Sequence, residues 1–156
     1  MARIVLYGTV VMMSGLLGAN VYNSVVDAPN WGAFIPQSIE VARRYFAVAD
    51  PGTFYRVASP IAQVLALAAV VVCWRRPSVR WCAVGALALA LAGDALTFTY
   101  FYPRNAIMFE GAIDPAAASR AWREWSLMNH VRSLFVAAAL TVELTALSRW
   151  ERLTRY

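Results

Sequence analysis

Residues 57–102 read VASPIAQVLALAAVVVCW, then RRPSVR, then WCAVGALALALAGDALTFTYFY, which makes two apolar runs around a short basic turn. A helix needs roughly 20 mostly apolar residues to cross the hydrocarbon core of a bilayer. Each run has about that length, and in lipid the backbone must satisfy its own hydrogen bonds, as a helix does. We therefore predict a pair of transmembrane helices in the middle of the chain.

Two more apolar runs flank this pair, at residues 4–26 and 125–147. The composition agrees with four membrane spans, because 60% of the residues are hydrophobic and only 15% are charged. Soluble domains carry about 25% charged residues. The predicted fold is an all-α integral membrane four-helix bundle. It forms one domain over residues 1–156, with helices at about 4–26, 57–74, 81–102 and 125–147.

The connections between the four runs differ in length. Residues 75–80 form a short basic turn, whereas residues 27–56 form a long loop with three prolines. Within that loop, residues 38–47 have the pattern of a short amphipathic helix with Ser38 as its N-cap. Pro103 is expected to end the third helix. Residues 103–122 then form another loop on the same side, with a helical alternative from Pro115 onward.

The arginines predict the orientation, because cytoplasmic loops are enriched in basic residues. One side has seven arginines against one glutamate, a net charge of +6: Arg3, Arg75, Arg76, Arg80, Arg149, Arg152 and Arg155 against Glu151. The other side has six of each sign, a net charge of zero. We therefore expect both termini in the cytoplasm and the long loops outside. The Arg-only, Ala-rich composition is typical of a high-GC bacterium and places the chain in an inner membrane.

The same distribution explains the net charge of +5 without a nucleic-acid partner, because the arginines flank apolar segments. Cys73, Cys82 and His130 are the only cysteines and histidine. A zinc site needs about four ligands rich in these residue types. The sequence therefore predicts no bound metal and no other cofactor, and the two cysteines are interpreted as packed thiols.

Polar residues recur at helical spacing inside three of the predicted spans. The three sets are Asn20, Asn23 and Asp27; Asp94, Thr97, Phe101 and Asn105; and Trp122, Trp125, Asn129 and Arg132. Each set lies along one face of its helix. At 1.5 Å per residue all three fall in the half of the bundle away from the termini. Such residues are costly in lipid and usually face the bundle interior, so we predict one shared polar pocket.

The residues of this pocket have two kinds of predicted role. Asp94 and Arg132 are expected to pair there, which would keep both charged. The catalytic candidates are Asp94, Asn129, Arg132, Asn105 and His130. The substrate-binding candidates are Asn20, Tyr22, Asn23, Thr97, Tyr100, Phe101, Trp122 and Trp125. A purely structural hydrogen-bond network is the alternative for the polar residues, and an interfacial belt is the alternative for the aromatic ones.

Three short motifs carry a resemblance to a known family. The third span ends LTFTYFYPRN at residues 96–105, the fourth opens WSLMNHVRS at 125–133, and the first contains GANVY at 18–22 followed by Pro29. A Thr before Pro-x-Asn, and a Trp followed seven residues later by Arg, resemble the anthrone oxygenase-like family of small four-helix membrane proteins. The similarity covers most of the chain.

The resemblance implies a cofactor-independent oxygenase that converts the methylene of an anthrone to a quinone carbonyl. Asp94 or His130 would take the proton, and Arg132 with Asn129 would hold the anionic oxygen. The same residues would also suit a non-oxidative acid–base enzyme, such as an epoxide hydrolase, a cyclase or an isomerase. An alternative of another class is a non-catalytic binding, transport or assembly protein. The expected partners are a lipophilic small molecule, membrane lipid and a second copy of the chain.

Overall fold

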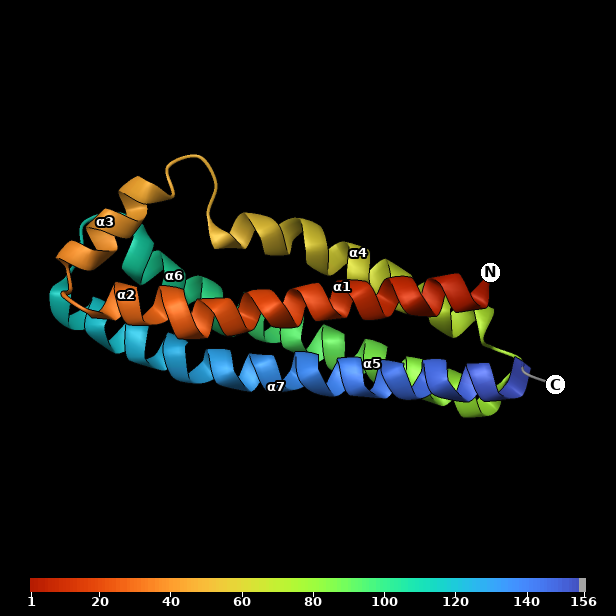
Figure 1. Cartoon of the computed structure of the whole chain (residues 1–156). Helices are drawn as coiled ribbons and strands as arrows, with labels where there is room; N and C mark the ends of the chain where they lie inside the picture. Colours follow the sequence, from red (N-terminus) through yellow and green to blue (C-terminus); the bar gives the residue numbers. More distant parts are fainter. Residues whose placement is uncertain (155–156) are drawn as a thin grey trace.

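The computed structural model describes residues 1–154, and Arg155 of the basic set lies outside them. Every regular element in this part of the chain is helical. The helices form four long rods, which run back and forth along one another (Figure 1). Both termini lie at one end of the bundle, here called the terminal end. The opposite end, here called the loop end, carries the short helices α2, α3 and α6.

The first rod is longer than predicted and contains a wider turn. It consists of α1 (Ala2–Tyr22), a π-helical turn η1 (Asn23–Asp27) and α2 (Ala28–Gly32). The helix therefore continues past residue 26, and Pro29 does not interrupt it because it stands in the first turn of α2. A proline is tolerated there because its missing N–H would have no partner in the helix.

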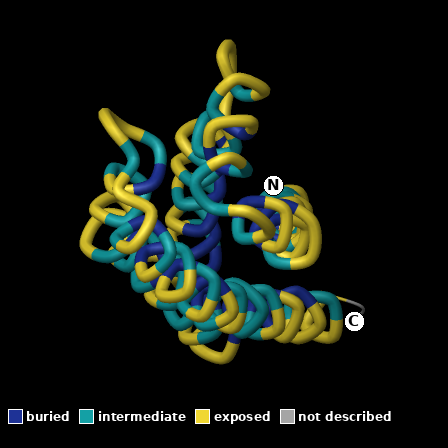
Figure 2. The backbone as a smooth tube through the Cα atoms, turned by 90° about the vertical axis from the view of Figure 1, so that its left-hand side faces the viewer, coloured by how far each residue is buried: buried dark blue, intermediate teal, exposed yellow. Residues whose placement is uncertain are grey.

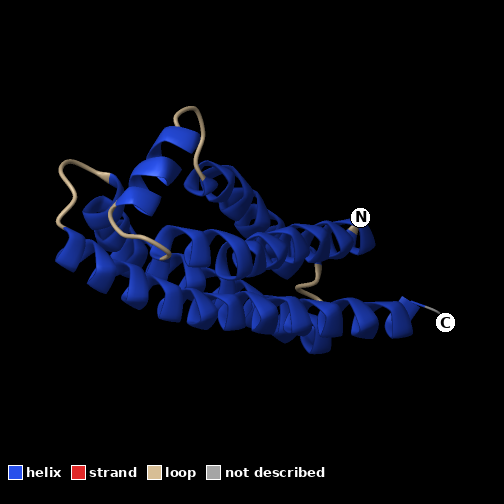
Figure 3. Ribbon diagram, turned by 60° about the vertical axis from the view of Figure 1, so that its left-hand side comes forward, coloured by secondary structure: helices blue, strands red, loops and turns tan. Residues whose placement is uncertain are grey.

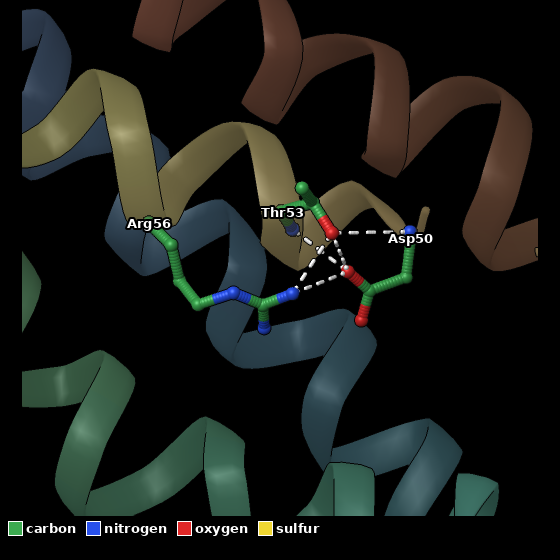
Figure 4. A network of polar contacts seen from close by, with 3 residues as sticks. All are labelled: Asp50, Thr53 and Arg56. Carbon is green, nitrogen blue, oxygen red and sulfur yellow. Dashed lines mark hydrogen bonds and ion pairs between the residues drawn. The ribbon is translucent and has the colours of Figure 1, made fainter. Parts of the chain in front are cut away.

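The second rod, α4 (Pro51–Val72), begins six residues before the predicted start. Asp50 is its N-cap: the carboxylate accepts from the Thr53 backbone N–H at 2.7 Å, and the Asp50 N–H donates to Thr53 Oγ1 at 3.3 Å. This reciprocal capping box, with Pro51 in the first turn, starts a helix inside the segment that was predicted as a loop. Figure 4 shows the capping residues together with Arg56.

The third rod also continues through a predicted end. It consists of α5 (Pro77–Leu96), a second π-helical turn η2 (Thr97–Phe101) and α6 (Tyr102–Phe109). The prediction that Pro103 ends this helix was wrong. Pro103 stands in the first turn of α6, directly after η2. Because a π turn already shifts the hydrogen-bond register, the missing N–H of the proline costs little there.

The fourth rod, α7 (Pro115–Thr154), is a single helix of 40 residues. Its start at Pro115 agrees with the helical alternative for residues 115–122, whereas α6 replaces most of the remaining predicted loop. The amphipathic helix is confirmed as α3 (Gln37–Tyr45). Ser38 is not its N-cap, because it lies inside the helix, where its hydroxyl donates to the Trp31 carbonyl at 2.6 Å. Figure 3 shows a loop at each end of α3, which lies in the connection between the first and second rods.

Small side chains let the rods approach closely. α7 packs along α5 and α1, and α4 packs against α1 and α5. Ala62, Ala66 and Ala69 of α4 are buried, as are Ala83 and Ala86 of α5. Small residues at helix contacts are typical of membrane bundles, where close backbone packing holds the helices together.

The outer surface of the rods is apolar. Exposed side chains there include Ile4, Val11, Val64 and Leu134, and Figure 2 shows buried backbone concentrated where the rods meet. Four helical stretches are long and apolar enough to cross a membrane: Ala2–Gly32, Pro51–Val72, Pro77–Phe109 and Pro115–Thr154. The predicted fold class is therefore confirmed: the protein is an all-α integral membrane bundle.

Candidate functional site

Two cavities lie along the axis of the bundle. The first, here called the bundle chamber, has a volume of about 470 Å³, is partly open, and is lined by residues of α1, α4, α5, η2, α6 and α7. The second, here called the loop-end chamber, has a volume of about 790 Å³ and reaches up to α3 and α6. Both volumes are in the range of small-molecule pockets. The predicted pocket away from the termini therefore exists, in two compartments.

Arg132 lies where the two chambers meet. Five residues line both chambers: Tyr55, Arg56, Thr97, Tyr102 and Arg132. Of these, Arg132 is buried, with 7% of its surface exposed. Its guanidinium carbon lies 4.2 Å from the ring centre of Phe101 and 4.9 Å from that of Tyr55. These ring faces attract a cation, so Arg132 is held by aromatic rings between the chambers.

Arg132 has no carboxylate partner within residues 1–154. The ion pairs there join Arg3 to Glu151, Arg56 to Asp50, and Arg104 to Glu124. Arg132 donates to Asn129 Oδ1 at 2.5 Å, and its Nε has no hydrogen-bond partner in the described part of the chain. An arginine stays protonated in proteins. The site thus contains a buried cation with unused donors, and an anionic or electron-rich ligand group would complete it.

Asn129 connects Arg132 to the first rod. Its Nδ2 donates to the Asn20 carbonyl at 3.1 Å and to Ser24 Oγ at 2.7 Å. Asn20 is the last polar residue before η1, where the π turn shifts the backbone hydrogen bonds by one residue. The turn η2 lies on the third rod and contributes Thr97 and Phe101 to the same site. π turns are frequent at functional sites, and here two of them flank one arginine.

Tyr55 is a site residue that the sequence analysis missed. Its hydroxyl donates to Asn20 Oδ1 at 3.1 Å and accepts from Asn23 Nδ2 at 3.1 Å. It belongs to a polar stripe on α4 that continues with Ser59 and Gln63, at i, i+4 and i+8. All three line the bundle chamber. The spacing was visible in the sequence, but Tyr55 lay in the segment interpreted as loop.

Asp94 lines the bundle chamber with Arg132, but the predicted ion pair between them does not form. Gln63 donates from its Nε2 to Asp94 Oδ2 instead. The pairing was predicted from helical spacing and depth, which do not show where the Gln63 amide or the rings around Arg132 lie. Asp94 therefore faces the same cavity as the cation while being hydrogen-bonded to α4, and a ligand between them could contact both.

The other candidates divide between the two chambers and the outer surface. Asn20 lines the bundle chamber, Thr97 lines both chambers, and Asn23, Phe101, Asn105 and Trp125 line the loop-end chamber. Five candidates line neither chamber: Tyr22, Tyr100, Trp122, Asn129 and His130.

Three of these five residues face the outer surface or bond elsewhere. His130 is exposed on the outer side of α7, because it is turned by about 100° from Asn129. Its predicted role as a base at the pocket is therefore not supported. Tyr22 is 56% exposed, and the Trp122 indole donates to the Ala28 carbonyl at 2.7 Å. Among residues 1–154, no three His, Cys, Asp or Glu side chains come together to hold a metal ion.

An ion pair stands at the wall of the loop-end chamber. Asp50 and Arg56 both line it, and their charged atoms lie 3.1 Å apart (Figure 4). Partial burial raises the pKa of Asp50, but the hydrogen bonds from Thr53 and the charge of Arg56 lower it more. The net effect is a pKa below the ordinary value of 3.8. Because both side chains are half exposed, the pair contributes little to stability.

Comparison with known proteins found no match: no protein-family model, no curated protein and no solved structure matches this chain. The class of protein is therefore given by the fold and the chambers, as an integral membrane helical bundle with a polar site inside an apolar wall.

Proposed function

We propose that the protein is a membrane enzyme that removes a proton from a carbon next to a carbonyl group in a hydrophobic, oxygenated small molecule. One observation carries the proposal: Arg132 is buried between two chambers without a carboxylate partner in residues 1–154. A buried, unpaired cation is unfavourable unless it serves a ligand. A carbonyl oxygen that becomes negative during the reaction fits that position.

In the proposed mechanism Asp94 takes the proton. Both groups line the bundle chamber, so a substrate carbonyl at Arg132 would bring its neighbouring C–H bond toward the carboxylate. The electron pair of that bond moves onto the carbonyl oxygen, which becomes an enolate held by Arg132. Gln63 donates to one oxygen of this carboxylate. General-base catalysis of this kind requires such hydrogen-bond reach.

The walls of the bundle chamber support a lipophilic substrate. They include Met13, Leu16, Ala62 and Val136 beside the few polar groups. Pockets of this composition bind mostly apolar ligands and orient them through a small number of hydrogen bonds. A substrate of this kind would dissolve in the surrounding bilayer, which explains why the site would lie inside a membrane protein.

The resemblance to anthrone oxygenases suggests the step after the proton transfer. The carbanion of an anthrone reacts directly with dioxygen; one oxygen atom becomes the quinone carbonyl and the other leaves as water. Arg132 would stabilise the anion before dioxygen attacks, and Asn129 would position Arg132, because the amide N–H groups of Asn129 already donate to the Asn20 carbonyl and Ser24. Without dioxygen, the same deprotonation would lead to isomerisation or cyclisation, which is the second form of the proposal.

The experiment is dioxygen uptake by the purified protein in detergent, with an anthrone as the substrate. We expect uptake and quinone formation above the spontaneous rate, and a loss of about 100-fold or more in Arg132→Ala. His130→Ala is the matched control, because its side chain is exposed outside both chambers on the same helix.

Three outcomes of this experiment are distinguishable. Uptake in the wild type that Arg132→Ala retains would contradict the role of Arg132. Exchange of the acidic protons with deuterated water in the absence of uptake would support the non-oxidative form. Neither exchange nor uptake by the folded wild type would overturn the enzyme and favour a binding or transport protein.

We further propose that both termini face the cytoplasm of a bacterial inner membrane. The described basic side chains do gather at the terminal end: Arg3 pairs with Glu151 at 3.4 Å, and Arg149 donates to the Ser78 carbonyl at 2.9 Å. Positive charge is retained on the cytoplasmic side. Fusions of alkaline phosphatase after residue 48 and after residue 154 test this, with activity expected only for the first.

A further inference from the structure

A second group of unused donors lies in the loop-end chamber. Trp125 is 4% exposed and lines this chamber, and its indole Nε1 has no hydrogen-bond partner in the described residues. Buried indole N–H groups normally find an acceptor. The neighbouring Trp122 obeys that rule, since its Nε1 donates to the Ala28 carbonyl. The unpaired N–H of Trp125 therefore indicates that a ligand supplies its acceptor.

Trp125 and Arg132 are close to each other. The guanidinium carbon of Arg132 lies 6.0 Å from the ring centre of Trp125, and both residues line the loop-end chamber. Arg132 Nε is also without a partner within residues 1–154. Two buried donors that lack acceptors and border one cavity match a ligand group with several lone pairs and no donor of its own.

The wall around these donors is aromatic. Trp125 packs edge to face on Trp31 and Phe101, with 5.1 Å and 5.5 Å between the ring centres. Trp31 packs in the same way on Phe109, with 5.1 Å between the ring centres. All four rings line the loop-end chamber. Because the rings pack on one another, the wall is rigid and holds the Trp125 indole in one place. An acceptor group in this chamber would therefore meet a preorganised donor.

We propose that the loop-end chamber is a second binding compartment for the substrate, in which Trp125 Nε1 and Arg132 donate hydrogen bonds to an oxygen acceptor of the ligand. The acceptor is a carbonyl, phenolate or carboxylate oxygen, and the rest of the ligand extends past Arg132 into the bundle chamber. This inference rests on the proposed function for the identity of the ligand. It makes Trp125 a residue that selects oxygenated molecules over plain hydrocarbons.

Equilibrium binding of a matched pair of probes tests the proposal. The probes are tritiated 9-fluorenone, which has one carbonyl acceptor, and tritiated fluorene, which has none. Binding to the full chain in detergent is corrected for partition into protein-free micelles. Trp125→Phe keeps an aromatic ring and removes the N–H. We expect it to weaken fluorenone binding about three- to tenfold, the value of one hydrogen bond, and to leave fluorene binding within about twofold.

Trp81→Phe is the matched control, because Trp81 is 64% exposed and lines neither chamber. Unchanged fluorenone binding in Trp125→Phe would overturn the proposal, as would an equal loss for fluorene. Absence of saturable fluorenone binding by the wild type would also overturn it. Because no turnover is measured, saturable fluorenone binding by a wild type that shows neither dioxygen uptake nor proton exchange would reject the proposed chemistry and leave this inference standing, so the two failures are separable.

A second measurement on the wild type covers the case in which Trp125→Phe does not fold. The indole N–H resonance of Trp125, recorded by ¹⁵N NMR and assigned by elimination among single Trp→Phe variants, reports on its hydrogen bond directly. Fluorenone should shift this proton downfield, and fluorene should not. The same response to both probes, or no response, would contradict a hydrogen bond from Trp125 to the carbonyl.

Discussion

Asn129 and Arg132 lie one turn apart on α7, and the Arg132 guanidinium donates to Asn129 Oδ1 at 2.5 Å. Since the amide nitrogen of Asn129 donates to the first rod, one side chain both positions the buried cation and ties two helices together. The consequences of this arrangement, and of three other contacts, can be measured.

Removing the Asn129 amide should affect both the position of Arg132 and the contact between α7 and the first rod. Asn129→Ala leaves the Asn20 carbonyl and Ser24 without their donor and frees the guanidinium of Arg132. We expect a loss of about 1–2 kcal/mol in the free energy of unfolding. The rate of dioxygen uptake with an anthrone should fall at least about tenfold. Ser133→Ala is the control, because Ser133 only bonds the backbone of its own helix at 2.8 Å. Unfolding in mixed micelles measures stability, and equal stability for the two variants would contradict the link.

Arg43 should hold α3 over the loop-end chamber. Its guanidinium donates to three backbone carbonyls, those of Gly111 at 2.8 Å, Met108 at 2.9 Å and Glu110 at 3.0 Å. We expect Arg43→Ala to speed amide hydrogen exchange in residues 37–45 about tenfold or more, while the four long rods keep their protection. Arg44→Ala, at the exposed neighbouring position, should leave exchange unchanged. Equal exchange in both variants would show that other contacts hold α3.

Gly32 should tolerate no side chain. A Cβ at this position would lie inside the indole ring of Trp122, whose Nε1 is held by the Ala28 carbonyl. Because a rigid ring in a bonded position cannot move aside cheaply, Gly32→Ala should cost about 1–3 kcal/mol of stability.

Gly18→Ala is the opposite case. It has nothing within 4 Å of the added methyl group, so it should be neutral or stabilise α1 by up to about 1 kcal/mol. Thermal unfolding of both variants checks the sign.

The capping carboxylate of Asp50 should make stability depend on acid pH. Its pKa in the folded protein lies below the ordinary 3.8. The stabilisation is therefore fully present above about pH 5 and is lost as the pH falls below 3.8 through the folded value. Asp50→Asn keeps an N-cap acceptor but removes the charge, so its stability should change less between about pH 5 and about pH 3. The difference is a few tenths of a kcal/mol, because the pair is half exposed. Parallel pH profiles for the two proteins would contradict the assignment.

Much of the fold could be predicted from the sequence, because membrane insertion depends on a property that each segment has by itself. A run such as 57–74 is long and apolar enough to span whatever its neighbours are. The depth of the polar residues followed in the same way from the rise of a helix, so the stripe containing Asn129 and Arg132 was correctly placed at the bundle interior. The amphipathic helix was recognised from its own periodicity.

The helix ends were predicted less well, because they depend on local contacts that a hydropathy pattern does not contain. The capping box of Asp50 and Thr53 begins α4 in polar sequence. The turn η2 lets the third rod run through Pro103. A proline is compatible with a helix only where its missing N–H would be unpaired, and the π turn that creates this position was not visible in the residue types.

The sequence by itself determined that the chain forms four apolar helices with polar residues in one half of the bundle, since length, hydropathy and helical spacing are local quantities. Only the tertiary structure decided which polar groups meet. Asp94 accepts a hydrogen bond from Gln63 instead of pairing with Arg132, Tyr55 lies in the site, and His130 faces outward. Arg132 and Trp125 each keep a donor without an acceptor in residues 1–154. Such choices depend on the rotation and approach of whole helices, which are set by packing over the full length of the bundle.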